Sequence, residues 1–279
     1  MRLRGVRKST NIEDRRGQRR VGGRAGGLSA GAVLLILAIG YFTGIDVVPL
    51  LEEQAGSVGE PRALSEADQQ AADFTSRVLA TTEQVWAARF EEELGRSYQP
   101  PVLVLFGGAT QSPCGGASGA TGPFYCPADQ KAYLDTQFFA TMSQRLGAGG
   151  DFAAAYVVAH EVAHHVQNQL GILKQVHDLR RQSSRSQANA LTVRLELQAD
   201  CLSGVWAASV QGLMERGDLA EALNAARMIG DDQLQRSAGR VPQPHTFTHG
   251  TSAQRARWFE RGFDQARIAA CDTFSTNRL

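Results

Sequence analysis

Histidine and cysteine are scarce in this 279-residue chain, and neither sign of charge is in excess. The formal net charge is +1, so the chain as a whole offers no electrostatic argument for nucleic-acid binding. Its four cysteines show no Cys-x-x-Cys spacing, which argues against a cysteine-ligated metal site. No Asp-x-Asp-x-Asp-Gly loop occurs, so nothing indicates a calcium site. Only six histidines are present, and the spacing of two of them carries the strongest functional signal.

The charged residues are unevenly distributed along the chain. Residues 1–27 hold eight arginines and one lysine against two acidic residues. Residues 28–45 then run for 18 positions without a charge, about the minimum for a helix that spans a membrane. Residues 46–65 have little apolar pattern and contain glycine and proline, as a linker does. The sequence therefore predicts a basic tail, one transmembrane anchor, a linker and a domain over residues 66–279.

The basic flank predicts how this anchor is oriented. The positive-inside rule keeps residues 1–27 in the cytoplasm and places residues 66–279 outside the cell membrane. A cleaved signal peptide is less favoured, because the basic region is long and no Ala-x-Ala site follows the apolar core. A nucleic-acid-binding arm is also less favoured, because no aromatic residues interleave the arginines. We expect membrane association through residues 28–45 and no nucleic-acid partner, and the sequence does not give the oligomeric state.

The four cysteines fit a location outside the cytoplasm, where disulfides persist. Cys114 and Cys126 bracket a loop rich in glycine, serine and threonine, and Cys201 and Cys271 remain as a second pair. Four cysteines permit three connectivities, and the sequence does not choose among them. Closing the loop between Cys114 and Cys126 would contribute about 3 kcal/mol to stability in a chain-entropy model. Buried free thiols are the alternative.

Hydrophobic periodicity predicts an α+β domain that is mostly helical, with a small sheet. Apolar residues near helical spacing, with polar caps and glycine stops, mark the helices. Two short runs of apolar and β-favouring residues mark the strands. The predicted helices span residues 66–94, 136–146, 152–170, 184–210, 218–229 and 251–269, and the predicted strands span residues 102–106 and 131–135.

The predicted helix over residues 152–170 contains the pentad His160-Glu161-Val162-Ala163-His164. Two histidines four residues apart lie on one face of a helix, where both imidazoles can reach one Zn²⁺. The same geometry places the Glu161 carboxylate beside the metal, where a water would be bound. Asp151 is a candidate N-cap for this helix, and Gly171 is a natural stop. Two incidental helix histidines are the alternative interpretation.

A third ligand is needed, because catalytic zinc normally has three protein ligands and one open position. The predicted helix over residues 184–210 offers Glu196 and Asp200, which are four residues apart and share a face. We assign Glu196 as the ligand. Asp200 is then the partner of the far nitrogen of a ligand histidine, which fixes the tautomer of that histidine. The reverse assignment remains open, because both carboxylates face the same way.

In these motifs the chain resembles the gluzincin group of zinc metallopeptidases, in which HExxH is followed by ExxAD on a later helix. It resembles more closely the bacterial putative neutral zinc metallopeptidase family. The similarity covers nearly the whole chain and includes its start over residues 1–17, Cys114-Gly, Gly122-Pro-Phe-Tyr-Cys-Pro127 and the segment Phe247-Thr-His-Gly-Thr-Ser-Ala-Gln-Arg255. The resemblance implies a zincin-like catalytic domain and peptidase-type chemistry, but it implies no particular substrate.

Many sites of this kind add a hydrogen-bond donor for the oxyanion that forms during peptide cleavage. His249 is the leading candidate, because it precedes Gly250 on a turn that leads into a helix and could enter the cleft. A histidine that caps or bridges local backbone is an equally favoured interpretation. His245, Tyr156 and Arg255 are weaker candidates for the same role.

Two further histidines are not expected to bind the metal. His165 lies about 100° round the helix from His164, so we expect it in the core or behind the ligands. His177 follows the helix and is expected to be exposed. By resemblance, a strand that precedes the active helix pairs with extended substrate, and residues 133–135 and 102–106 are the candidates.

Together these features predict a membrane-anchored, extracytoplasmic zinc endopeptidase that acts on polypeptides. Zn²⁺ held by His160, His164 and Glu196 would bind a water and lower its pKa. Glu161 would take the proton of that water and pass it to the leaving amine. One alternative is a non-catalytic anchored protein that keeps the fold for binding a partner, against which an intact Glu161 argues. Another is a zinc hydrolase of a non-peptide amide or ester.

Overall fold

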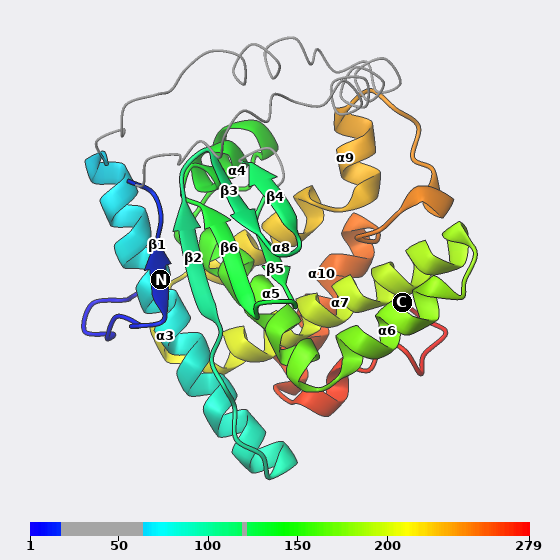
Figure 1. The fold of residues 1–279 in the computed structure, drawn as a ribbon, viewed down its shortest axis with the longest axis horizontal. Helices are drawn as coiled ribbons and strands as arrows, with labels where there is room; N and C mark the ends of the chain where they lie inside the picture. The colour runs from blue at the N-terminus through cyan, green and yellow to red at the C-terminus, as the bar shows by residue number, and fades with distance from the viewer. Residues whose placement is uncertain (18–63, 119–121) are drawn as a thin grey trace. The chain divides into compact units, whose positions relative to one another are not determined.

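The structure is a computed structural model that describes residues 1–17, 64–118 and 122–279 (Figure 1). The predicted membrane span, residues 28–45, lies outside the described residues, as does nearly all of the predicted linker. Among the residues that are described, no helix is long and apolar enough to cross a membrane.

The described residues form an α+β domain that is mostly helical, as the sequence predicts. All six predicted helices are present, with ends shifted by a few residues. Two shorter helices, α6 and α9, were not predicted. The α-helices are α3 Glu66–Leu94, α4 Phe138–Leu146, α5 Asp151–Gln169, α6 Ile172–Arg181, α7 Arg185–Ser209, α8 Asp218–Met228, α9 Asp231–Ser237 and α10 Ser252–Gln265.

Within the described residues the main sheet has four strands, in the order β1-β2-β6-β5. Its strands are β1 Ile12–Asp14, β2 Val102–Phe106, β6 Lys131–Asp135 and β5 Phe124–Cys126. The β1–β2 and β2–β6 pairs are parallel, and β5 is antiparallel to β6. A separate hairpin joins β3 Ala109–Ser112 to β4 Gly115–Ser118.

Both predicted strands, β2 and β6, are central strands of this sheet. Each is hydrogen-bonded to a neighbour on both sides, so neither has a free edge that could pair with a substrate. The prediction that residues 133–135 or 102–106 would do so is therefore wrong. The reason is that β1 and β5, which flank these strands, are too short to be recognised from periodicity.

The first residues of the chain belong to this domain rather than to a separate tail. Met1–Arg16 and Ser65–Leu279 form one compact unit, and β1 supplies an edge strand of its sheet. The predicted basic tail over residues 1–27 is therefore wrong for residues 1–16. A second unit, Gly17–Leu64, lies almost wholly outside the described residues.

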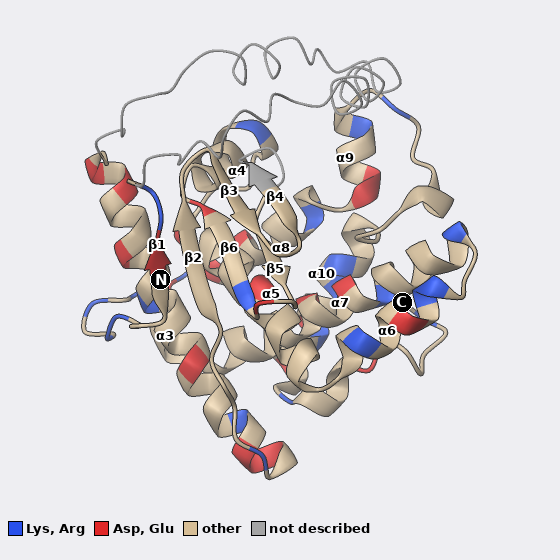
Figure 2. Cartoon of the chain, in the orientation of Figure 1, with Lys and Arg blue, Asp and Glu red and all other residues tan. Residues whose placement is uncertain are grey.

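Two basic residues of this N-terminal arm, Met1–Arg16, form ion pairs with acidic residues of α3, Arg7 with Glu83 and Lys8 with Asp73 (Figure 2). The buried carboxylate of Glu83 accepts hydrogen bonds from Arg7 at 2.5 Å and Asn11 at 2.8 Å, and it also accepts one from Ser9. Local charge pairing therefore explains why a strongly basic segment packs onto the domain, which a count of positive charges does not reveal.

Helix α5 is buried along almost its whole length and contacts both the sheet and α7. It begins at Asp151, whose carboxylate accepts a hydrogen bond from the Met1 amino group at 2.7 Å. Gly150, with φ of +116°, is the N-cap, so the prediction of Asp151 in that role is wrong by one residue. Gly171 follows the end of the helix with φ of +78°, which confirms the predicted stop.

Helices α7 and α10 approach very closely because each presents a glycine to the other. A Cβ added at Gly262 of α10 would lie 1.8 Å from the Cys201 carbonyl oxygen, and one added at Gly204 of α7 would lie 2.1 Å from the Phe259 carbonyl oxygen. No side chain fits at either position without moving backbone. This contact brings the first turns of α10 next to the middle of α7.

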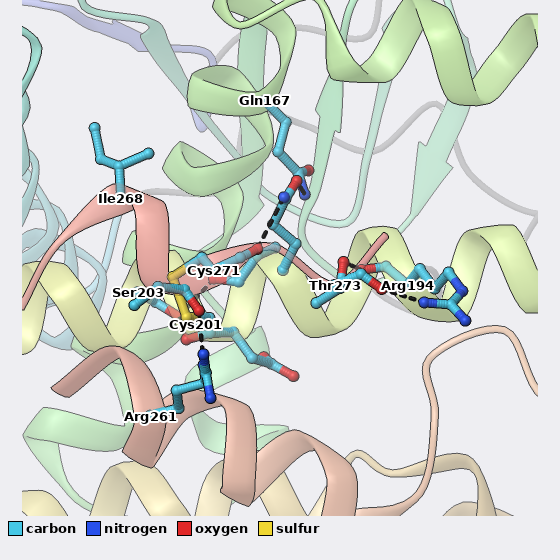
Figure 3. The surroundings of a disulfide bond; sticks show 12 residues. Gln167, Arg194, Cys201, Ser203, Arg261, Ile268, Cys271 and Thr273 are labelled. Atoms are coloured by element: carbon cyan, nitrogen blue, oxygen red, sulfur yellow. Dashed lines mark hydrogen bonds between the residues drawn. A yellow bond between two sulfur atoms is a disulfide. The ribbon is translucent and has the colours of Figure 1, made fainter. Parts of the chain in front are cut away.

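The cysteines form two disulfides, Cys114–Cys126 and Cys201–Cys271, which selects one of the three possible connectivities. The second disulfide ties the segment after α10 to α7 (Figure 3). Helix α10 ends at Gln265, earlier than predicted, because Ala266 adopts a left-handed conformation with φ of +50°. The chain can then turn back toward Cys201.

Candidate metal centre

The three predicted metal ligands lie together where α5 passes α7. Glu196 Oε2 is 3.2 Å from His160 Nε2, and Glu196 Oε1 is 3.6 Å from His164 Nε2. One ligand atom from each residue lies within 4.8 Å of the other two. Ligands about 2.0–2.2 Å from a tetrahedral zinc lie about 3.4 Å from one another, so these separations suit one shared ion. Two imidazoles and one carboxylate also match a donor set that catalytic zinc uses.

The electrostatics of this cluster also suit a cation. Burial lowers the pKa of His160, but the Asp200 and Glu196 carboxylates outweigh this effect and raise that pKa to about 10. Burial raises the pKa of Glu196, but His164 and His160 outweigh it, so that pKa falls below its ordinary value. The site thus favours positive charge between its carboxylates. A divalent cation would supply that charge once the imidazoles are neutral.

Glu161 lies on α5 next to His160 and is buried. Burial raises the pKa of Glu161, while the positive charge of His164 and His160 partly offsets this rise. A carboxylate with a raised pKa holds a proton more readily than an ordinary glutamate does. This property suits a group that must accept a proton and then release it.

Asp200 lies behind His160 and is fully buried on α7. Its Oδ1 is 3.0 Å from His160 Nδ1, although the two atoms are not aligned as a hydrogen bond. Because Asp200 faces the far nitrogen of His160, the structure places it where the predicted partner of a ligand histidine would lie. Glu196, rather than Asp200, joins the two histidines in the cluster.

Tyr156 and Arg255 do not have the position expected of the oxyanion donors that the sequence suggested. Both are fully buried, and both bind Asp200. The Tyr156 hydroxyl donates to Asp200 Oδ1 at 2.6 Å, and Arg255 Nε donates to Asp200 Oδ2 at 2.8 Å. The prediction of either residue as an oxyanion donor is therefore wrong, because their donor groups are already engaged behind the cluster.

Gln167, which the sequence did not indicate, supports His164, the second predicted ligand histidine. Its Oε1 accepts a hydrogen bond from His164 Nδ1 at 2.9 Å. Its Nε2 donates to the Leu195 carbonyl oxygen at 2.8 Å and to Gln198 Oε1 at 3.0 Å, so the amide orientation is set. The spacing of three residues after His164 is the only sequence signal that could have indicated it.

His249 lies on the turn before α10, and its side chain is 48% exposed. Its neighbour Gly250, with φ of +88°, packs against α7. A Cβ there would meet Leu197 at 3.2 Å and Val193 at 3.3 Å. The His249 turn therefore adjoins the part of α7 that carries Glu196. The Asp231 carboxylate raises the pKa of His249, and Glu196 raises it further. Burial lowers this pKa, but by less, so the pKa lies above its ordinary value.

Asp231, at the start of α9, holds this turn and was not predicted. Its Oδ2 accepts backbone N–H groups of Thr248 at 2.7 Å, His249 at 2.6 Å and Gly250 at 3.0 Å. Its Oδ1 lies 3.2 Å from His249 Nδ1. Both interpretations of His249 therefore have support, because its backbone is bridged locally while its ring stays accessible.

The remaining histidines lie outside the cluster. His165 is buried, with Nε2 2.6 Å from the Gln99 carbonyl oxygen and Nδ1 2.9 Å from the Tyr125 hydroxyl, which confirms that it belongs to the core. His177 is exposed on α6, as predicted. His245 is exposed in a short 3₁₀ segment and is not part of the cluster.

An α+β domain with two imidazoles and a carboxylate converging from neighbouring helices points to a zinc-dependent hydrolase. A sequence profile of the family described as "Putative neutral zinc metallopeptidase" matches residues 1–274. The chain therefore belongs to this family. The description of this family implies zinc dependence and a polypeptide substrate for its members.

Two relatives show how far the similarity extends. The chain is 48% identical over 286 residues to the uncharacterized protein YpfJ of Escherichia coli K12, with 98% of this chain and 99% of the relative covered. It is 41% identical over 216 residues to the uncharacterized protein Rv2575 of Mycobacterium tuberculosis H37Rv, with 73% of this chain and 71% of the relative covered. No solved structure matches the chain.

Proposed function

We propose that this protein is a zinc-dependent endopeptidase with a zincin-like catalytic domain. The observation that carries the proposal is the convergence of ligand atoms of His160, His164 and Glu196 between α5 and α7, where each lies within 4.8 Å of the other two. Family membership supports the same chemistry. The three residues would hold the zinc, which would supply Lewis acidity for activating a water and polarising the peptide carbonyl.

Glu161 is the proposed general base and acid. It takes a proton from the attacking water as the water oxygen bonds to the carbonyl carbon, and it gives that proton to the leaving amine as the C–N bond breaks. Its place beside His160 on the same helix, its burial and its raised pKa support this role.

His249 is the proposed donor to the oxyanion. Its ring is accessible, its turn adjoins the segment of α7 that carries Glu196, and its Nδ1 faces Asp231. When Nδ1 of an imidazole is bound to a carboxylate, Nε2 is free, and a protonated Nε2 can donate a hydrogen bond. Preorganised donors of this kind stabilise charge that develops in the transition state.

Strand β5 is the proposed docking edge for an extended polypeptide. It pairs with β6 on one side, and within the described residues no strand pairs with its other side. Tyr125 of β5 binds α5 directly, because its hydroxyl contacts His165 Nδ1 at 2.9 Å and accepts from Asn168 Nδ2 at 3.0 Å. An added strand here would run beside the helix that carries the cluster.

We propose that the domain works outside the cytoplasm and that residues 28–45 associate with a membrane. The two disulfides support the first part, and the charge-free run of 18 residues supports the second. The arm over residues 1–16 is part of the same compact unit as residues 65–279. The predicted topology puts the N-terminus in the cytoplasm, which does not fit the pairing of β1 with β2. We therefore propose that the arm lies on the same side of the membrane as the domain.

Labelling of whole cells with a membrane-impermeant thiol reagent tests this placement. Arg4→Cys reports on the exposed arm, and Gln175→Cys reports on the exposed surface of α6. No free cysteine occurs among the residues that the structure describes, so background labelling is low. We expect both variants to be labelled. Protection of the arm alone would contradict a shared compartment.

Metal content and turnover test the proposed chemistry. Elemental analysis of the full-length chain should find one zinc per chain, with zinc lost or greatly weakened in Glu196→Ala. Glu161→Gln should keep the zinc but lose peptide cleavage by about 100-fold or more, whereas Glu91→Gln, exposed on α3, should cleave normally. A folded wild-type chain without zinc would contradict the site. Cleavage of non-peptide amides or esters in place of peptides would contradict the endopeptidase assignment.

A further inference from the structure

We infer that Tyr156 and Arg255 are positioning residues of the metal centre, which act through Asp200 on the imidazole of His160. The inference rests on the proposed zinc site but not on the identity of the substrate. It extends the site from the three ligands and Asp200 to two buried residues, Tyr156 and Arg255, that lie outside the HExxH and ExxAD motifs.

The Asp200 carboxylate is held by hydrogen bonds from two other residues. Arg255 Nε donates to Oδ2 at 2.8 Å, and Arg255 Nη2 donates to Oδ1 at 2.9 Å. The Tyr156 hydroxyl donates to the same Oδ1 at 2.6 Å. A two-point guanidinium contact sets the plane of the carboxylate, and the tyrosine fixes its rotation further.

This carboxylate faces the one nitrogen of His160 that the metal would not use. Asp200 Oδ1 is 3.0 Å from His160 Nδ1, whereas His160 Nε2 faces Glu196 at 3.2 Å. His160 Nδ1 is buried and makes no hydrogen bond within the described part of the chain. A carboxylate at this position favours a proton on Nδ1, which leaves the Nε2 lone pair for a metal.

Arg255 reaches Asp200 because of the way α10 is built. The helix begins with a capping box in which Thr251 and Gln254 each bind the backbone of the other. Farther along, Gly262 allows α10 to approach α7 at the Cys201 backbone. The long Arg255 side chain is thereby buried against Asp200, and its Nη2 also donates to the hydroxyl of Tyr156 of α5 at 3.2 Å.

A purely structural role does not explain this cluster well. A buried ion pair is weak evidence for stability, because the cost of removing both charges from water offsets their attraction. Asp200, Arg255 and Tyr156 are all buried, and the carboxylate that they surround is directed at a predicted ligand. Tuning of that ligand accounts for both the burial and the direction.

Zinc affinity of the full-length protein tests the inference independently of catalysis. Tyr156→Phe removes one hydroxyl and keeps the ring, so the fold should be retained. We expect its zinc affinity, measured by competition with a chromophoric chelator, to fall roughly tenfold or more, as is typical when partners of metal ligands are removed. Arg255→Lys, which keeps the charge but loses the two-point contact, should weaken zinc binding in the same direction.

Two control variants separate this effect from general destabilisation. Tyr98→Phe removes another buried hydroxyl, one that has no hydrogen-bond partner among the described residues, and it should leave zinc affinity unchanged. Val205→Ala makes a cavity in the core of α7 and should lower the melting temperature without changing zinc affinity. Tyr98→Phe thus controls for the loss of a buried hydroxyl, and Val205→Ala controls for a loss of stability.

The possible outcomes distinguish the inference from the proposed function. Unchanged zinc affinity in both Tyr156→Phe and Arg255→Lys, or an equal loss in Val205→Ala, would overturn the inference even if wild type cleaves peptides. A tenfold loss confined to the Tyr156 and Arg255 variants would support it even if wild type cleaves none. A wild-type chain that binds no zinc would overturn the inference together with the metal site.

Discussion

The buried carboxamide of Gln167 orients the imidazole of His164. Gln167 Nε2 is committed to the Leu195 carbonyl oxygen at 2.8 Å, so its Oε1 must face His164 Nδ1, which lies 2.9 Å away. Figure 3 shows Gln167 extending toward the segment that contains Cys271. The proton of His164 is thereby held on Nδ1, and Nε2 is left facing Glu196. Each predicted ligand histidine thus has its own partner, a carboxylate behind His160 and an amide behind His164.

Replacing Gln167 with Leu should weaken zinc binding roughly tenfold, because the His164 tautomer is no longer fixed. Gln169→Leu is the matched control. Gln169 lies one position beyond Asn168 on the same helix, but its Nε2 contacts His165 and the Gln99 carbonyl oxygen instead of a ligand. Chelator competition on the full-length protein measures both variants, and equal affinity in Gln167→Leu and wild type would contradict the assignment.

Asp231 should act on catalysis only through His249. Asp231→Asn keeps an acceptor for the three backbone N–H groups of the turn but loses the charge beside His249 Nδ1. We expect kcat/KM to fall about 100-fold in His249→Ala, as for loss of one oxyanion donor, and by less in Asp231→Asn. In the double variant the Asp231 change should add nothing further.

Asp232→Asn is the control for this double-mutant cycle. Among the described residues Asp232 binds Ser252 at the start of α10 and Arg236 of α9 instead of His249, so its effect should be the same with and without His249. If the fold losses in kcat/KM of the two single variants multiply in the double variant, Asp231 is a structural residue of the turn and not a positioning residue of His249.

Gly262→Ala should destabilise the domain by about 3 kcal/mol or more, because its Cβ would overlap the Cys201 carbonyl oxygen at 1.8 Å. Helix propensity alone would make Gly262→Ala stabilising by about 1 kcal/mol, so a destabilising effect of any size already indicates the close contact. Gly212→Ala, at a position with open space, should change the unfolding free energy by less than about 0.5 kcal/mol. Denaturant unfolding compares the two, and similar effects would rule out the close contact of α7 with α10.

Stability of the zinc-free protein should depend on His165 in mildly acidic solution. Burial lowers the pKa of His165, so the unfolded chain binds a proton more readily than the folded one. The stabilisation is present above the unfolded pKa of about 6.5 and is lost as the pH falls below it, by at most about 1.4 kcal/mol per pH unit. His165→Gln should remove this part of the pH dependence between pH 7.5 and 5.5. If His165→Gln keeps the wild-type dependence of the unfolding free energy on pH, His165 is not its source.

Local sequence pattern predicted most helices and the two central strands, because periodicity and glycine stops act over a few residues. It failed where the deciding contact is distant. Strand β1 is three residues long and depends on its parallel pairing with β2, which follows it by about 90 positions in the chain. The basic composition of the arm suggested a cytoplasmic tail, whereas Glu83 of α3 binds three of its residues.

The sequence by itself determined that His160, Glu161 and His164 share one helix, because a spacing of four residues on a helix has a single geometric outcome. It also determined that Glu196 and Asp200 share another helical face. Only the tertiary structure decided between those two carboxylates, since the answer depends on how α7 packs against α5 and α10. The disulfide pairing and the placement of Gln167 and Asp231 depend on contacts of the same kind, which join residues that are close in space and carry no periodic signal along the chain.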